Sequence, residues 1–215
     1  YDGHMAREEL VTLPDGRVVS YDASGAMMFG FCDLNGTAVH FDERDGHMAI
    51  HEFVNVADGT LYYGDDGRKV TGEANVDGAW YYLDPARDGR TARSAFVDLG
   101  SKVVYYGADG AMLMGTEAYL DGAWRYFDRY DGHMVRNDYV NLGHKIVFYD
   151  ASGAMVLGRE YQTPDGAWHY LDAYDGHLAR NEFVNLGHKW VYYDQATKMA
   201  FGERNVGGNW FYFYP

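Results

Sequence analysis

The chain has 215 residues, a formal net charge of −14, an aromatic content of 17%, 27 glycines and only 4 prolines. The negative charge argues against a nucleic-acid partner, because phosphates require a face rich in lysine and arginine, and it argues equally against an anionic membrane surface. No run of about 18 apolar residues is present, so the sequence predicts no membrane-spanning helix and no membrane insertion. Cys32 is the only cysteine, which excludes an internal disulfide.

Asp-Gly pairs open five copies of one repeat, with successive spacings of 43, 43, 43 and 44 residues, at Asp2, Asp45, Asp88, Asp131 and Asp175. The copies form a single repeat array without a linker, at 2–44, 45–87, 88–130, 131–174 and 175–215. Tyr1 stands where Tyr130 and Tyr174 end earlier copies, so we expect the chain to begin at a repeat seam of a longer array.

Each copy contains two similar halves. An example of a first half is "DGHLARNEFVNLGHKWVYYD" (175–194), and an example of a second half is "ASGAMVLGREYQTPDGAWHYLDAY" (151–174). Both halves consist of a glycine turn, an apolar residue, a short strand, a second turn and an aromatic strand, which predicts a β-hairpin. Asp77-Gly78, Asp121-Gly122 and Asp165-Gly166 supply the left-handed backbone positions that tight hairpin turns require. The aromatic strands are expected, in chain order, at 18–21, 38–41, 60–63, 80–83, 103–106, 124–127, 146–149, 168–171, 190–193 and 210–213.

These ten hairpins predict the fold class. A lone hairpin is only marginally stable in water, whereas hairpins in sequence can bury their aromatic side chains against their neighbours. We therefore expect an all-β fold, an elongated solenoid of stacked β-hairpins. A five-bladed propeller is the alternative, because the repeat length would suit a four-stranded blade. The duplication within each copy favours the hairpin stack.

The segments "GEANVDGAWYYLD" (72–84), "EFVNLGHKWVYYD" (182–194) and "GERNVGGNWFYFY" (202–214) resemble the cell-wall-binding repeats. This family includes choline-binding modules, glucan-binding repeats and the C-terminal repeats of clostridial toxins, and the resemblance extends over all five copies. It implies a left-handed superhelix of hairpins and a non-catalytic module of a secreted or surface-attached bacterial protein. It also implies ligand sites in shallow aromatic grooves between successive hairpins.

One feature departs from the choline-binding version, which has a tryptophan directly after the glycine that opens the first strand. The corresponding segments "GEANV", "GTEAY", "GREYQ" and "GERNV" lack it. In alternate halves an aromatic residue lies near that position, at Phe53, Phe96, Tyr139 and Phe183. This difference favours a sugar-binding groove, or a site used in only some copies, over a complete cage for a quaternary ammonium.

The first position of the aromatic strand is tryptophan in four of the five second halves. An indole offers a flat surface for a sugar ring and is the best side chain for a cation over its face. The ligand-binding candidates are Trp80, Tyr82, Trp124, Tyr126, Trp168, Tyr170, Trp190, Trp210, Phe183 and Tyr139. The alternative is that these rings, at regular positions of a solenoid, form its core.

Other kinds of site are not predicted. Histidines 43 residues apart, such as His4 and His47, would bind a metal only if the fold brought them together. The default role of the recurring aspartates is turn formation, and calcium binding in these turns is the alternative. The sequence has no Gly-x-Ser-x-Gly elbow, P-loop or His-Glu-x-x-His motif. We therefore expect no catalytic residues, metal or cofactor within this chain, although an enzyme domain can precede it.

The leading hypothesis is a non-catalytic binding module of a secreted or cell-surface protein, whose partner is a bacterial cell-wall polymer or another surface glycan. The first alternative is a choline-binding anchoring module, in line with the acidic charge. The second alternative is a structural spacer that has no ligand.

Overall fold

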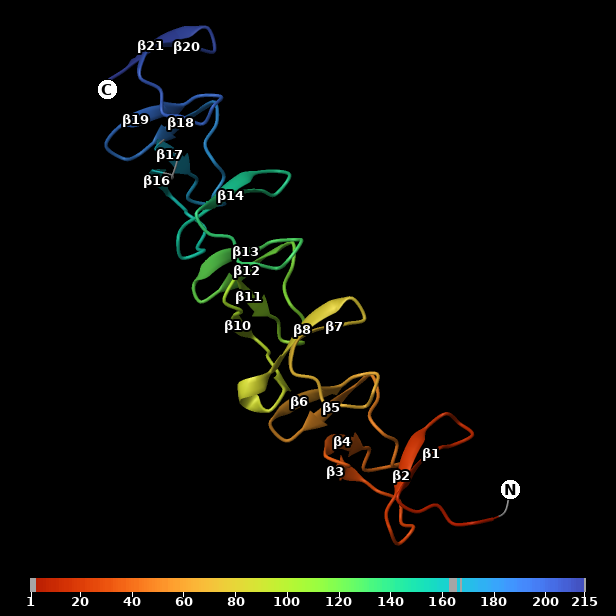
Figure 1. Cartoon of the computed structure of the whole chain (residues 1–215). Coiled ribbons are helices and arrows are strands. Elements are labelled where there is room, and N and C mark those ends of the chain that lie inside the picture. The colour runs from red at the N-terminus through yellow and green to blue at the C-terminus, as the bar shows by residue number, and fades with distance from the viewer. Residues whose placement is uncertain (1–2, 163–165, 167, 215) are drawn as a thin grey trace. The chain divides into compact units, whose positions relative to one another are not determined.

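The computed structural model describes residues 3–162, 166 and 168–214 (Figure 1). Tyr1 and Asp2, at the expected repeat seam, and Asp165, in one expected turn, lie outside the described residues. Within the described part, no helix is long and apolar enough to cross a membrane. Helical structure there amounts to one 3-10 turn, η1 (Pro85–Arg87).

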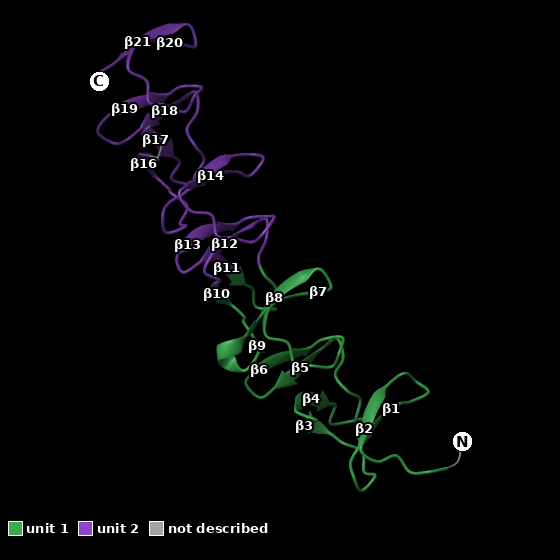
Figure 2. Ribbon diagram, viewed as in Figure 1, with its two compact units in different colours: residues 1–97, 105–112 green, residues 98–104, 113–215 purple. Residues whose placement is uncertain are grey.

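The chain divides into two compact units, residues 1–97 with 105–112 and residues 98–104 with 113–215 (Figure 2). The strands before the boundary are β1 (Glu9–Thr12), β2 (Val18–Tyr21), β3 (Gly30–Leu34), β4 (Thr37–Phe41), β5 (Glu52–Val56), β6 (Gly59–Tyr63), β7 (Gly72–Val76), β8 (Ala79–Asp84) and β9 (Arg90–Thr91). The boundary falls within the hairpin of β10 (Ala95–Asp98) and β11 (Val103–Tyr106).

The remaining strands belong to the second unit. They are β12 (Thr116–Leu120), β13 (Ala123–Phe127), β14 (Asp138–Asn141), β15 (Ile146–Tyr149), β16 (Arg159–Gln162), β17 (Trp168–Leu171), β18 (Glu182–Asn185), β19 (Trp190–Tyr193), β20 (Gly202–Val206) and β21 (Asn209–Phe213). Each expected aromatic strand therefore exists, and begins within one residue of its predicted start.

Consecutive strands pair as ten antiparallel hairpins, each in its own small sheet, and β9 adds a third strand to β7–β8. A propeller blade would require four strands in one sheet, and none of the described sheets has more than three. The expected turns are present where they are described, with φ of 50° at Asp77 and 87° at Gly78. The prediction of an all-β hairpin stack is thus confirmed, and the propeller is excluded.

Backbone hydrogen bonds from the linker segments hold each hairpin to the next one. Beyond β15, the amide of Met155 donates to the carbonyl oxygen of Trp124 in β13 at 2.8 Å, and the next amide, of Val156, donates to Phe148 in β15 at 2.9 Å. The same contact recurs in the first unit, where Met112 donates to Trp80 at 2.8 Å. One linker thus joins two successive hairpins through main-chain groups, independently of the side chains around it.

The core of each unit is a series of small clusters rather than one large centre. One cluster joins Val135, Val147, Tyr149 and Met155, with the ring of Tyr126 packed against it. Its members come from two hairpins and the linkers that follow them, so each hairpin supplies part of its neighbour's core. This arrangement meets the requirement that a hairpin be covered before it is stable.

Candidate ligand-binding site

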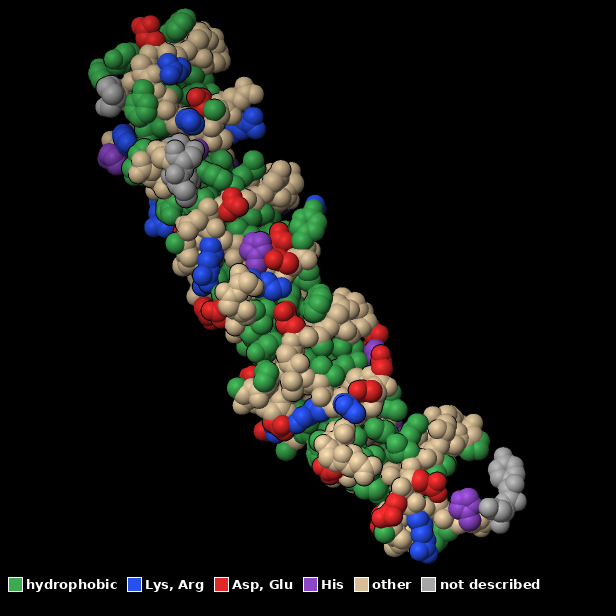
Figure 3. All heavy atoms as spheres, viewed as in Figure 1, with side chains coloured by type: hydrophobic (Ala, Val, Ile, Leu, Met, Phe, Trp, Pro, Cys, Tyr) green, Lys and Arg blue, Asp and Glu red, His purple; other side chains and the backbone are tan. Residues whose placement is uncertain are grey.

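Five tryptophans lie on the surface of the hairpins. Their exposed fractions are 40% for Trp80, 43% for Trp124, 49% for Trp168, 65% for Trp190 and 73% for Trp210. Large apolar side chains at regular positions of a repeat are normally buried, so these values decide against a role for the indoles as core. Green apolar side chains accordingly reach the surface among the charged ones in both units (Figure 3).

Tyr82, Tyr126 and Tyr170 share a strand face with Trp80, Trp124 and Trp168, but they are only half-buried rather than exposed. Each packs against a buried tyrosine of the next hairpin. The ring centroids are 6.1 Å apart for Tyr82 and Tyr106, 6.3 Å for Tyr126 and Tyr149, and 6.2 Å for Tyr170 and Tyr193. The tryptophans therefore form the outer edge of each candidate site, and the paired tyrosines form its base.

A glutamate lies directly across from each of these half-buried tyrosines, as in the pair Glu117 and Tyr126. The hydroxyl of the buried Tyr149 donates to Glu117 Oε1 at 2.6 Å, and Tyr193 donates to Glu160 Oε1 at 2.8 Å. Burial, together with the neighbouring carboxylate, raises the pKa of both tyrosines, so their hydroxyls stay protonated and act as donors. In these copies the second position of the first strand holds a carboxylate bonded to tyrosine, and not an aromatic ring.

Phe183 and Trp190 occupy one face of the β18–β19 hairpin. Trp190 lies directly across from Asn185, and Asn185 is two residues from Phe183 on the same strand. Phe183 is 38% exposed, and its ring lies 5.2 Å from Phe211 of the following hairpin. Its side chain thus bridges two hairpins at the edge of the Trp190 surface.

Tyr139 is half-buried, with its ring 4.9 Å from Phe148 and 5.9 Å from His169. It lies in the packing between two hairpins and not beside an exposed tryptophan. The structure therefore brings the candidates together in small sets, one for each hairpin, and leaves Tyr139 apart from them.

Phe31 was missed by the sequence reasoning. It follows Gly30, at the position that Glu73 takes in the next copy, and it is 62% exposed. Its ring meets His40 edge-on at 4.8 Å, and burial lowers the pKa of His40, which favours the neutral imidazole. A groove of about 530 Å³ begins at Phe31 and His40 and continues past Glu43 and Glu52. The sequence feature that could have identified Phe31 is an aromatic residue directly after a strand-opening glycine.

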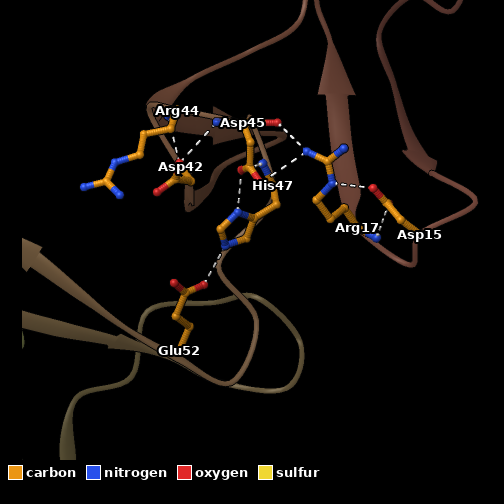
Figure 4. A network of polar contacts seen from close by, with 7 residues as sticks. All are labelled: Asp15, Arg17, Asp42, Arg44, Asp45, His47 and Glu52. Atoms are coloured by element: carbon orange, nitrogen blue, oxygen red, sulfur yellow. Dashed lines mark hydrogen bonds and ion pairs between the residues drawn. The ribbon is translucent and has the colours of Figure 1, made fainter.

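Aspartates and a histidine recur in the turns that open the repeats, as in Asp42, Asp45 and His47, whose ligand atoms lie within 4.8 Å of one another. Asp42 Oδ1 accepts from the amides of Arg44 and Asp45, and Asp45 Oδ1 accepts from the amide and ring of His47 (Figure 4). These bonds shape the turn, as expected from the default role of aspartate. The cluster is therefore explained by turn geometry.

The fold and the exposed rings define a class, a hairpin-repeat module with an array of surface aromatics. Residues 94–139 and 140–183 match the family model described as the choline-binding repeat. No curated protein matches the chain. The repeats over residues 94–183 are thus similar to choline-binding repeats.

Solved structures of Streptococcus pneumoniae proteins are similar. The choline-binding domain of CbpL is 25% identical, with 86% of this chain and 93% of that chain covered, at a TM-score of 0.67. Choline binding protein F, solved with a peptidoglycan analogue, is 25% identical over 89% of this chain and 58% of its own, at a TM-score of 0.56. The modular autolysin LytC shares the fold at 20% identity and a TM-score of 0.70, and this chain covers 48% of its length.

Proposed function

We propose that this chain is a non-catalytic module that attaches a secreted or surface-bound protein to a cell-wall polymer. The observation that carries the proposal is the exposure of five indoles, each at the same position of a separate hairpin. Support also comes from the match of residues 94–183 to choline-binding repeats. The chain spans about half the length of the autolysin LytC, and any catalytic activity of the whole protein belongs to a part outside this chain.

Repetition gives such a module its strength. A single indole contact is worth roughly 0.5–2 kcal/mol, which is too little to hold a protein on a surface. Several weak sites on one chain act together on a polymer, because each further contact becomes intramolecular.

The test is retention on purified bacterial cell walls. Trp190→Ala with Trp210→Ala should weaken retention by about tenfold, because two stacking surfaces are lost. Tyr174→Ala is the matched control, because Tyr174 is 96% exposed in a turn and belongs to no candidate site. An unchanged β-sheet spectrum would show that the fold is intact. Equal retention of the double variant and the control would refute the proposed site, and no retention of the natural chain would favour the spacer.

Choline recognition is the second candidate function, favoured by the acidic groove beside Phe31. A quaternary ammonium would lie against the Phe31 ring with the Glu43 and Glu52 carboxylates near its charge. The chain should then bind a choline resin and elute with free choline, and Phe31→Ala should abolish this binding. Failure of the natural chain to bind the resin would exclude this function while leaving glycan binding open.

A further inference from the structure

Three of the exposed tryptophans lie directly across their hairpins from an asparagine. The register pairs are Asn75 with Trp80, Asn185 with Trp190, and Asn205 with Trp210. Opposite residues of an antiparallel pair project to the same face of the sheet. All six side chains are exposed, so each pair presents an indole and an amide together to the solvent.

The backbone places the two side chains of such a pair close together. The carbonyl oxygen of Trp80 accepts from Met112, outside its own hairpin, so it points away from the partner strand. This direction identifies Asn75 and Trp80 as a non-hydrogen-bonded pair, in which opposite Cα atoms are only about 4.5 Å apart.

A turn hydrogen bond orients each amide. Asn75 Oδ1 accepts from the amide of Gly78 at 3.2 Å, Asn185 Oδ1 from Gly187 at 2.8 Å, and Asn205 Oδ1 from Gly208 at 3.2 Å. Among the residues that the structure describes, none accepts a hydrogen bond from the NH₂ groups of these three asparagines. The oxygen of each amide is thus engaged, and its two N–H donors remain available beside the indole.

The turn itself does not require that nitrogen. Asp33 occupies the place of Asn75 in the β3–β4 hairpin and accepts from the amide of Gly36 at 2.6 Å. The residue across from Asp33 is Ala38, and no indole is present there. The NH₂ group therefore has no role in shaping these turns. In the hairpin where aspartate replaces asparagine, the tryptophan across from it is absent as well.

We propose that the Asn75–Trp80, Asn185–Trp190 and Asn205–Trp210 pairs are subsites for an N-acetylated pyranose. The indole stacks on the C–H face of the sugar, and the asparagine NH₂ donates to the acetamido oxygen. That oxygen only accepts, which matches an amide whose own oxygen is engaged. Carboxylates and phosphates also only accept, but the charge of −14 on the chain disfavours them. The inference rests on wall binding as the function and names the chemistry that the pairs select.

Two other hairpins provide internal comparisons. Trp124 lies across from Tyr119, whose ring is 5.6 Å away, so this hairpin has an indole without an amide. Asn141 lies across from Ile146, so that hairpin has an amide without an indole. Neither should act as a subsite.

The experiment follows the five indole N–H signals by NMR during titration with triacetylchitotriose, and with cellotriose, which lacks acetamido groups. We expect the signals of Trp80, Trp190 and Trp210 to shift with the acetylated sugar and not with cellotriose, while the signal of Trp124 stays in place. Uniform shifts of all five signals, or equal response to both sugars, would overturn the inference.

The decisive variant combines Asn75→Asp, Asn185→Asp and Asn205→Asp, which keeps the turn acceptor and removes the donors. It should bind triacetylchitotriose about tenfold more weakly, the effect of losing a hydrogen bond. Asn141→Asp is the control and should bind like the natural chain, whereas equal binding by the triple variant would refute the inference. Wall retention of the natural chain distinguishes failure of the inference from failure of the proposed function. Retention without sugar binding overturns the inference alone, and loss of retention overturns the proposed function.

Discussion

Single side chains determine whether the second position of a hairpin's first strand carries a carboxylate or an exposed aromatic ring. In three copies a tyrosine hydroxyl crosses to a glutamate of the preceding hairpin, as Tyr149 does to Glu117. In the first copy Phe31 stands in place of the glutamate, and the corresponding tyrosine is Tyr63. In three copies the position is therefore taken by a carboxylate bonded to tyrosine, whereas in the first copy it holds an exposed aromatic ring.

This difference predicts a difference in stability. Tyr149→Phe should lower the free energy of unfolding by about 1–2 kcal/mol, because a charged carboxylate loses its buried donor. Tyr63→Phe should cost clearly less, since no glutamate occupies the matching position before it. Urea denaturation of both variants provides the measurement, and equal losses would contradict the role assigned to the hydroxyl.

Histidines between two carboxylates predict a pH dependence. His47 Nδ1 lies 2.6 Å from Asp45 and its Nε2 lies 2.9 Å from Glu52, and a neutral imidazole cannot donate from both nitrogens (Figure 4). Burial lowers the pKa of His47, but the hydrogen bonds to these carboxylates outweigh it, and the pKa is raised overall. The same holds for His177 between Asp175 and Glu182.

A raised pKa in the folded state means that the stabilisation is complete below the unfolded value of about 6.5 and is lost as the pH rises through the folded value. The urea midpoint should therefore be higher at pH 6 than at pH 8. His47→Gln with His177→Gln should reduce this difference. His133→Gln is the matched control substitution, because among the described residues a carboxylate pairs with only one of its ring nitrogens. A midpoint that is the same at both pH values would rule out the effect.

At the scale of the element, tight turns set the register of each hairpin. Asp121 and Gly122 join β12 to β13 with φ of 50° and 77°. This geometry belongs to the two-residue turn whose twist matches that of the strands. The turn thus determines which residues share a face, and with them the position of Trp124.

Gly122→Ala should lower the free energy of unfolding by about 1 kcal/mol, because the left-handed backbone is costly for a residue with a Cβ atom. No atom lies within 4 Å of the added Cβ, so the cost reflects the backbone conformation alone. Asp121→Asn is the control and should be neutral, since asparagine tolerates this conformation. Thermal unfolding measures both variants, and an unaffected Gly122→Ala would contradict this account of the turn.

Hydrogen bonds between a hairpin tip and a later turn also recur, and in one copy the donor and the acceptor are exchanged between the two elements. Lys102 Nζ donates to the carbonyl oxygen of Asp131 at 2.7 Å. In the earlier copy the tip residue is Asp58, and Arg90 of the later turn donates to its carboxylate at 2.8 Å. The position thus requires a donor and an acceptor in contact, whichever element supplies each.

At the scale of the whole molecule, each unit gains stability from neighbouring hairpins, and under the proposed function the chain would gain affinity from repeated sites. No single site needs to be strong. The large negative charge disfavours polyanions that carry no cationic group.

Multivalency predicts how losses combine. Trp190→Ala alone should reduce wall affinity only a few-fold, whereas replacement of all five tryptophans should reduce it by about 100-fold or more, in line with the gain expected from linked sites. Binding isotherms on purified walls provide the measurement. A single replacement that abolishes binding would point to one dominant site and contradict the repeated-site model.

Much of this protein follows from local sequence. The hairpins, their turns and the position of Trp80, Trp124, Trp168, Trp190 and Trp210 at strand starts were predictable, because strand alternation and left-handed turn residues act over only a few positions. The exposure of these indoles was not, since a ring at a regular position is equally consistent with a core.

The tertiary structure decided which rings are covered. Tyr149 and Glu117 are 32 residues apart, and only the stacking of hairpins brings the hydroxyl to the carboxylate. The pairing of Asn185 with Trp190 depends likewise on the register of the hairpin. Local patterns determine the elements because turns and alternation are short-range. Contacts between elements determine the sites, because burial depends on which neighbour covers each face.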